Sequence, residues 1–150
     1  MSLVSQVAAL ATAVGAGLKA LTQRVSILES GVYSVENLVF SVSGNLSVKV
    51  GGSRYPIKGG TFTILSVAAE IGNAPGGQAV IADVNKNGTS IYGTQANRPT
   101  FAAASNVATV GTHSTSSLTT GDHITVDIDQ IGTGPVGADM VLVVRIQRTA

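Results

Sequence analysis

The sequence predicts a mainly β protein, with an antiparallel β-sandwich or jelly-roll head behind an N-terminal α-helical coiled-coil stem that assembles as a trimer. Three observations predict this fold class. A seven-residue apolar repeat fills the first part of the chain, residues after 35 alternate with a period of two, and glycine-rich turns separate the alternating runs. We therefore divide the 150 residues into a foot and stem over 1–34 and a head over 35–150.

The stem prediction rests on a heptad register that never slips. Its ten a and d positions are all apolar: Val4, Ala11, Leu18, Val25 and Val32 at a, and Val7, Val14, Leu21, Leu28 and Val35 at d. Such sustained apolarity is typical of a coiled coil. Gly15 and Gly17 each cost about 1 kcal/mol inside a helix, and Gly31 is expected to end it. The alternative is an amphipathic helix that packs on its own head.

The charged positions beside the seam favour an oligomer. Arg24 at g and Glu29 at the following e meet between chains in a parallel coil. Residues 24–29 also resemble a known trimerisation motif: Arg, an apolar residue, two residues, an apolar residue and Glu. Val at a with Leu at d would by itself favour dimers, and we let the motif decide for a trimer. The expected trimerisation residues are Leu18, Leu21, Arg24, Val25, Leu28 and Glu29.

The firm part of the predicted stem is 18–30, after the two glycines. The residues before it are apolar enough to dock. The most apolar run, 7–17, is too short to cross a hydrocarbon core of about 30 Å. No Lys or Arg precedes it, so the charged region of a signal peptide is missing. We therefore expect no contact with a membrane and interpret residues 1–13 as a foot. The expected docking residues are Leu3, Val4, Val7 and Leu10.

The head shows about eight short strand-like runs with turns between them and no helix. Residues 61–64 and 124–129 alternate, whereas 78–84 and 140–146 are apolar on both faces except for Asp83 and Arg145. The second pair should form strands that are covered on both sides. Asn-Gly at 87–88 is the strongest hairpin signal. The Ser/Thr-rich segment 102–120 is either a surface loop or carries one more short strand.

Charge and residue inventory exclude several functions. Nine Lys and Arg against eight Asp and Glu leave a net charge of +1, without the basic excess of an electrostatic nucleic-acid binder. There is no Cys, and a catalytic base would have to be His113 or His123, neither with a recognisable partner set. Residues 83–88 match the first half of a calcium loop, but Thr94 at the twelfth position cannot supply the bidentate acid. We expect no enzyme activity, no metal and no cofactor.

Sugar binding usually uses exposed aromatic side chains, and this chain offers few. Phe62 has the pattern of a core residue, while Tyr55 and Tyr92 lie near predicted loops. His113 lies in the Ser/Thr-rich segment. The possible ligand surface is therefore Tyr55, Tyr92 and His113.

Several segments together carry a family resemblance. They are the rod 8–29, the strand entry 43–48, the central segment 83–91, Asn-Arg-Pro-Thr at 97–100, and the closing segments 121–132 and 137–140. They resemble modules in structural proteins of tailed bacteriophages, which occur in fibres, tail tips and capsid decorations. The resemblance implies a trimer with a short coiled-coil stem and a β head, located on the virion. It transfers no catalytic residues.

The length favours one virion role over the others. A chain of 150 residues holds a stem and one head but no long shaft, which fits a capsid decoration protein or a short head fibre. The alternatives are a tail fibre or tail-tip receptor-binding protein, and a carbohydrate-binding adhesion module. The expected partners are two further copies of the chain and phage capsid or tail proteins, with a host surface glycan in the adhesion alternative.

Overall fold

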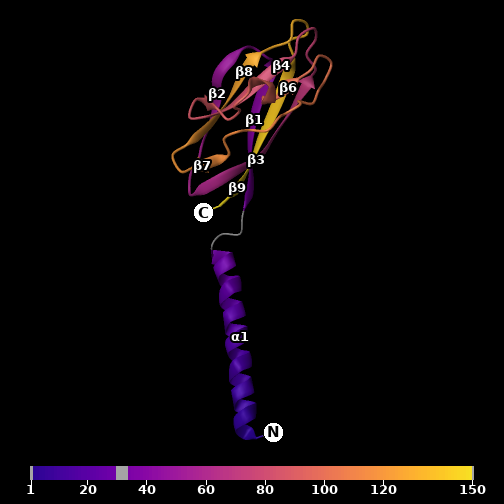
Figure 1. The fold of residues 1–150 in the computed structure, drawn as a ribbon. Helices are drawn as coiled ribbons and strands as arrows, with labels where there is room; N and C mark the ends of the chain where they lie inside the picture. Colours follow the sequence, from indigo (N-terminus) through magenta and orange to yellow (C-terminus); the bar gives the residue numbers. More distant parts are fainter. Residues whose placement is uncertain (1, 30–33, 150) are drawn as a thin grey trace. The chain divides into compact units, whose positions relative to one another are not determined.

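The computed structural model describes the backbone of residues 2–29 and 34–149 and the side chains of residues 2–26 and 34–149. The chain divides into two compact units, of which the first is Met1–Ser34 with Ala150 and the second is Val35–Thr149. The first unit contains the helix α1 (Leu3–Glu29), and the second contains all the strands (Figure 1). The described chain is therefore mainly β with one N-terminal helix.

Helix α1 has a defined start and no internal break. The Ser5 backbone N–H donates to the Ser2 hydroxyl at 3.2 Å, which is the bond of an N-terminal cap. The helix then continues for 27 residues, about 40 Å, through Gly15 and Gly17. The segment that we interpret as a foot is thus helical from Leu3 onward, and Gly31, the expected helix end, lies outside the described residues.

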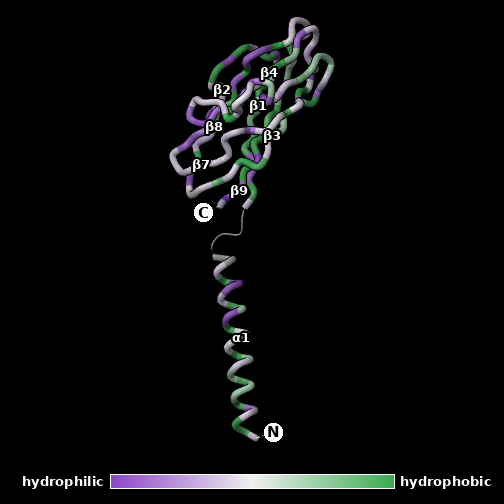
Figure 2. Tube along the Cα trace, viewed as in Figure 1, coloured by the Kyte–Doolittle hydropathy of each residue, from purple (hydrophilic) through white to green (hydrophobic). Residues whose placement is uncertain are grey.

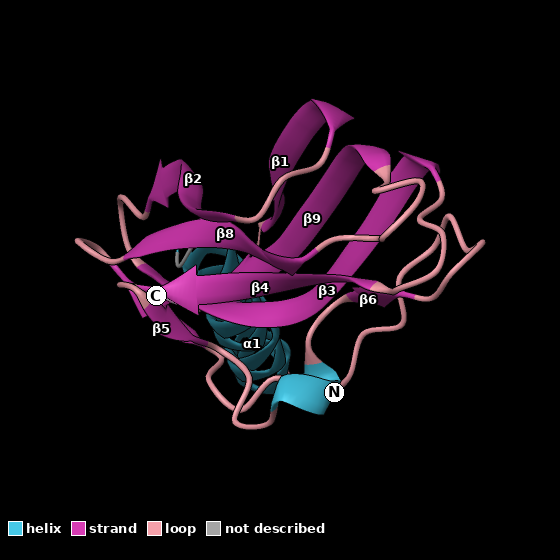
Figure 3. Ribbon diagram, turned by 90° about the horizontal axis from the view of Figure 1, so that it is seen from above, coloured by secondary structure: helices cyan, strands magenta, loops and turns pink. Residues whose placement is uncertain are grey.

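The head is built from nine described strands in two antiparallel sheets. The strands are β1 (Val35–Asn45), β2 (Lys49–Pro56), β3 (Thr61–Asn73), β4 (Val80–Lys86), β5 (Thr89–Ser90), β6 (Thr100–Phe101), β7 (Ser117–Thr119), β8 (His123–Gln130) and β9 (Ala138–Arg148). Sheet A has the order β1-β9-β3-β7, and sheet B has the order β2-β8-β4-β5 with β6 paired to β4. Figure 3 shows the two sheets as layers.

One hydrophobic core lies between the two sheets. Along β1 and β9 the inward positions are buried and alternate with exposed ones, as in Leu38 and Phe40 opposite Val144 and Leu142. Sheet B contributes buried side chains such as Val84 to the same cluster. Period-two patterning therefore places one face of each sheet in the core, as the sequence predicts.

The predicted Asn-Gly hairpin is confirmed. Asn87 and Gly88 both have positive φ, 53° and 83°, the geometry of the turn that matches strand twist. They connect β4 to β5. Of the two alternatives for segment 102–120, the strand-bearing one is confirmed, because the segment carries β7 and pairs with β3.

The sequence predicts that the runs 78–84 and 140–146 form strands covered on both sides. Within the single chain this prediction is right for β4 and wrong for β9. In β4 both faces are mostly buried. In β9 burial alternates, and Val141 is 41% exposed because no other part of the described chain packs on that side of sheet A.

Candidate functional site

Within the described residues, the seam of α1, formed by its a and d positions, is an exposed apolar surface. The expected trimerisation residues Leu18, Leu21 and Val25 are 64%, 57% and 39% exposed. Every other described a or d position of the helix is also exposed, and so is Arg24. The side chains of Leu28 and Glu29 lie outside the described residues. Figure 2 shows hydrophobic residues recurring along α1 between polar ones.

Of the predicted docking residues, Val4 and Val7 continue this seam toward the N-terminus, and Leu3 and Leu10 are g positions beside it. Leu3, Val4, Val7 and Leu10 are between 58% and 78% exposed. The b positions of the same heptads are all polar: Ser5, Thr12, Lys19 and Ser26. The helix thus has an apolar seam and a polar outer line, the distribution expected of a helix that associates in water.

By length and composition alone, the segment Leu3–Ser26 could cross a membrane. The expectation of no such span considered only the shorter run 7–17, and a signal sequence near the N-terminus passes the same test. A lipid-embedded helix would place Lys19 and the other b positions in or beside hydrocarbon, where ionisable side chains are costly. The heptad interpretation has no such cost.

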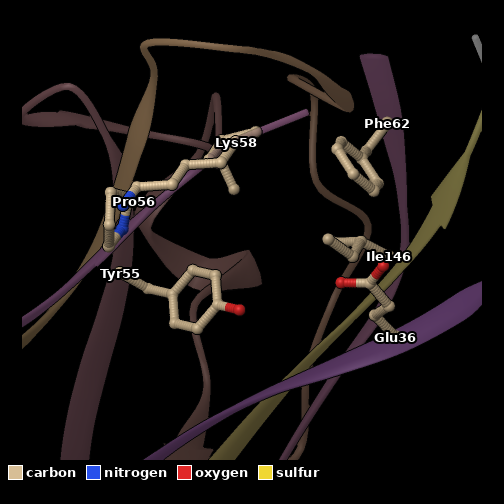
Figure 4. Close-up of a pocket in the computed structure, with 7 residues that line it drawn as sticks. Glu36, Tyr55, Pro56, Lys58, Phe62 and Ile146 are labelled. Carbon is tan, nitrogen blue, oxygen red and sulfur yellow. The ribbon is translucent and has the colours of Figure 1, made fainter. Parts of the chain in front are cut away.

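The head carries a cavity of about 300 Å³ at Tyr55, lined by Glu36, Tyr55, Pro56, Ile57, Lys58, Phe62 and Ile146. In Figure 4 the Tyr55 and Phe62 rings lie on opposite walls, and the Tyr55 hydroxyl and the Glu36 carboxylate face the space between them. Tyr55 is 42% exposed. An aromatic ring beside a carboxylate suits a polar ligand with one apolar face, such as a sugar.

The other two expected ligand residues do not join Tyr55. Tyr92 is only 5% exposed and packs in the core, so the expectation that it is exposed is wrong. The cause is a long-range contact, since Ser114 and Thr115 donate their N–H groups to the Ile91 carbonyl and hold this segment against the core. His113 is half-buried, with Nε2 3.2 Å from the Ile64 carbonyl oxygen.

A partly buried ionic cluster, in which Asp83 is the buried member, lies on the outer side of sheet B. Arg98 Nη1 donates to Asp129 at 2.7 Å, and Arg98 Nε lies 3.1 Å from Asp83 without hydrogen-bond geometry. Ser90 donates to the other Asp83 oxygen at 2.8 Å. Burial raises the pKa of Asp83, and the Ser90 bond and the Arg98 charge oppose that rise. The cluster ties the segment after β5 to the sheet.

Tyr92 is buried near this cluster, close enough for the charge of Asp83 to act on its hydroxyl. Burial and the charge of Asp83 raise the pKa of its hydroxyl, which makes no hydrogen bond within the described part of the chain. The described residues include no group of three or more His, Asp or Glu side chains placed to hold a metal. We interpret the cluster as structural.

Sequence reasoning missed Arg98 as the partner of Asp83. The signal was present in part, because Asp83 interrupts an otherwise apolar run and has to find a counter-charge when buried. Arg98 reaches it after the short helix η1 (Gln95–Asn97) turns the chain, and the Ala82 N–H donates to the Pro99 carbonyl at 2.9 Å.

A second ionic group fastens the Asn-Gly hairpin to the start of β8. Asp122 accepts hydrogen bonds from the Thr119 N–H at 2.8 Å and from the Asn87 side chain at 2.7 Å, and pairs with Lys86 at 2.9 Å. These contacts hold the pKa of Asp122 well below its ordinary value near 3.8, and the hydrogen bond from the Thr119 N–H has the largest effect.

Asp122→Asn is expected to lower the free energy of unfolding at pH 7 by about 1–3 kcal/mol, because the hydrogen-bond donors lose a charged acceptor. A depressed carboxyl pKa stabilises the fold above the ordinary pKa, and this contribution is lost as the pH falls toward the folded value. The variant's deficit should therefore shrink below about pH 4. Urea unfolding at several pH values measures it, with exposed Glu36→Gln as control. A deficit that stays constant with pH would contradict the assignment.

No protein-family model, no curated protein and no solved structure matches this chain. Its function therefore has to be inferred from the geometry of the chain itself.

Proposed function

We propose that this chain is a structural protein of a tailed-phage particle, a homotrimeric capsid decoration protein or short head fibre. The helix α1 is its stem, a parallel three-stranded coiled coil. Residues 35–149 form a jelly-roll-like head displayed on the particle surface.

The observation that carries the trimer is the exposure of the heptad seam. In the single chain Leu21 is 57% exposed, and Leu18 and Val14 on the same seam are 64% and 57% exposed. Burying a side chain of this size stabilises an assembly by about 1.5–3 kcal/mol. Most of the stability of a helix in a protein comes from packing of its apolar face, so association through the seam also accounts for the formation of α1.

Symmetry and the resemblance in sequence support the virion role. A threefold stem matches threefold or quasi-threefold sites on a capsid lattice, and three weak contacts then act together through effective concentration. The exposed foot residues Leu3, Val4, Val7 and Leu10 supply those contacts. The resemblance of the rod and head segments to phage structural modules supports the same role.

Two alternatives remain as competing proposals. A tail fibre or tail-tip protein would use the same stem and head at few copies per particle. A carbohydrate-binding adhesion module is favoured by one observation, the cavity beside Tyr55 with its aromatic walls and the Glu36 carboxylate. A glycan screen with Tyr55→Ala as the matched variant tests it, and binding that survives this change would contradict the assignment of the cavity.

The purified chain is expected to be a trimer of about 45 kDa, three times the 15.1 kDa of one chain. Light scattering in detergent-free buffer measures this mass. A monomer at micromolar concentration would contradict the coiled coil, and a protein that stays dispersed only in detergent would favour the membrane alternative for Leu3–Ser26.

Deleting residues 1–13 is expected to abolish binding to phage particles and to leave a folded trimer. Electron microscopy of particles with full-length and truncated protein measures the added density. Density at many symmetry-related capsid positions supports decoration, whereas density only at the tail supports the first alternative.

A further inference from the structure

The outer side of sheet A carries an apolar patch, which we call the valine face: Val39, Ala68, Val107, Val141 and Val143. The strand register puts these side chains on one side of the sheet. Val143 pairs with Val39 in β1 and with Ala68 in β3, and Val141 pairs with Glu70, which pairs in turn with Val107. Val39, Val107 and Val141 are 57%, 61% and 41% exposed.

Strand β9 has the composition of a strand that is covered on both sides, yet in the single chain only its inner side is covered. The comparison with β4 makes this plain. The apolar run 80–84 of β4 and the apolar run 140–146 of β9 are each interrupted by one charge, Asp83 and Arg145. In β4 the segment that carries Arg98 covers the outer side. On β9 no described residue does so, and the outer valines remain exposed.

We propose that the valine face is covered by other copies of this chain, and that three such faces enclose a second apolar core around the threefold axis of the trimer. The proposal rests on the proposed function, since it requires the trimer. It adds an interface in the head to the one in the stem.

Continuity with the stem points to this occupant. Counted through the sequence, Val35 is the last d position of the heptad register. Val35 is also the first residue of β1, where it pairs with Gln147. Because strand side chains alternate, Val35 shares its side of β1 with Asn37 and Val39. Val35, at which the heptad register of the sequence ends, therefore lies on the same side of β1 as the valine face.

The charges of this face complement each other. Arg145 lies between Asn37 and Ser66 on the face, on one side of the central apolar row, and Glu70 lies on the other. Within the described chain no ion pair joins either of them to another residue. Around a threefold axis, each copy can offer its Arg145 to the Glu70 of one neighbour and its Glu70 to the Arg145 of the other. A partner that carries charges of only one sign would place a like charge beside either Arg145 or Glu70.

Cysteine substitution tests this interface, because the chain has no cysteine of its own. The variants are Val39→Cys and Val141→Cys in the full-length chain, with Val50→Cys on β2, where Val50 is 82% exposed, as control. In the trimer, we expect V39C and V141C to react with a thiol reagent at least tenfold more slowly than V50C. Exposure in the single chain differs less than twofold between Val39 and Val50, so it cannot produce this difference.

The same variants combined with Leu21→Asp supply the second measurement. Once the stem has dissociated, V39C should react at a rate close to that of V50C. If V39C and V141C react as fast as V50C while light scattering gives a trimer, the interface is overturned and the proposed stem stands. A monomeric wild-type mass would overturn the proposed trimer and this interface together.

Discussion

Replacing Leu21 by aspartate is expected to convert the trimer into monomers and to leave the β head folded. Leu21 is a d position at the firm part of the stem, and its side chain is exposed in the single chain. Loss of a buried leucine costs about 2–5 kcal/mol, and a trimer incurs that cost in each chain. Three carboxylates brought together near one axis add repulsion and a desolvation penalty.

The measurement is light scattering for mass, with circular dichroism for the head. Gln23→Asp is the matched control, because Gln23 is an exposed f position on the polar side of the same helical turns. It introduces the same charge and should leave the mass at that of a trimer. If Leu21→Asp unfolds the strands as well, stem and head form one cooperative unit, and the division at residue 34 is wrong.

The stem shows how much a strict repeat reveals. The seven-residue period was sufficient to locate the helix and its apolar side, because both depend on local geometry. The two glycines do not interrupt α1, since their cost of about 1 kcal/mol each is small beside the hydrogen bonding of 27 residues. What the seam binds is not visible in one chain, so the trimer stays a prediction.

The head shows where sequence reasoning ends. Alternation and the Asn-Gly turn predicted strands and a hairpin correctly, because both signals are carried by neighbouring residues. The burial of Tyr92 depends on Ser114, and the partner of Asp83 is Arg98, each pair joined only by the tertiary fold. Nor does any local pattern say that β1 pairs with β9, the last strand of the chain.

Replacing Arg98 by methionine is expected to lower the free energy of unfolding at pH 7 by about 3–5 kcal/mol. Asp83 is only 4% exposed, and Arg98 is the cation beside it. Without Arg98 the carboxylate remains buried with Ser90 as its side-chain donor. Urea unfolding followed by circular dichroism measures the loss. Arg54→Met is the matched control, since Arg54 is an exposed arginine of sheet B, and its change should stay within about 0.5 kcal/mol.

The pH dependence distinguishes a charge effect from lost packing. Burial already raises the pKa of Asp83, and loss of the Arg98 charge raises it further. Between the ordinary value near 3.8 and this raised value, the folded protein holds a proton that the unfolded chain has released, so stability falls as the pH rises. The deficit of Arg98→Met should thus be largest at neutral pH and smaller near pH 4. Adding Asp83→Asn should recover part of it at pH 7. A deficit equal at both pH values would show that Arg98 stabilises the head through packing alone.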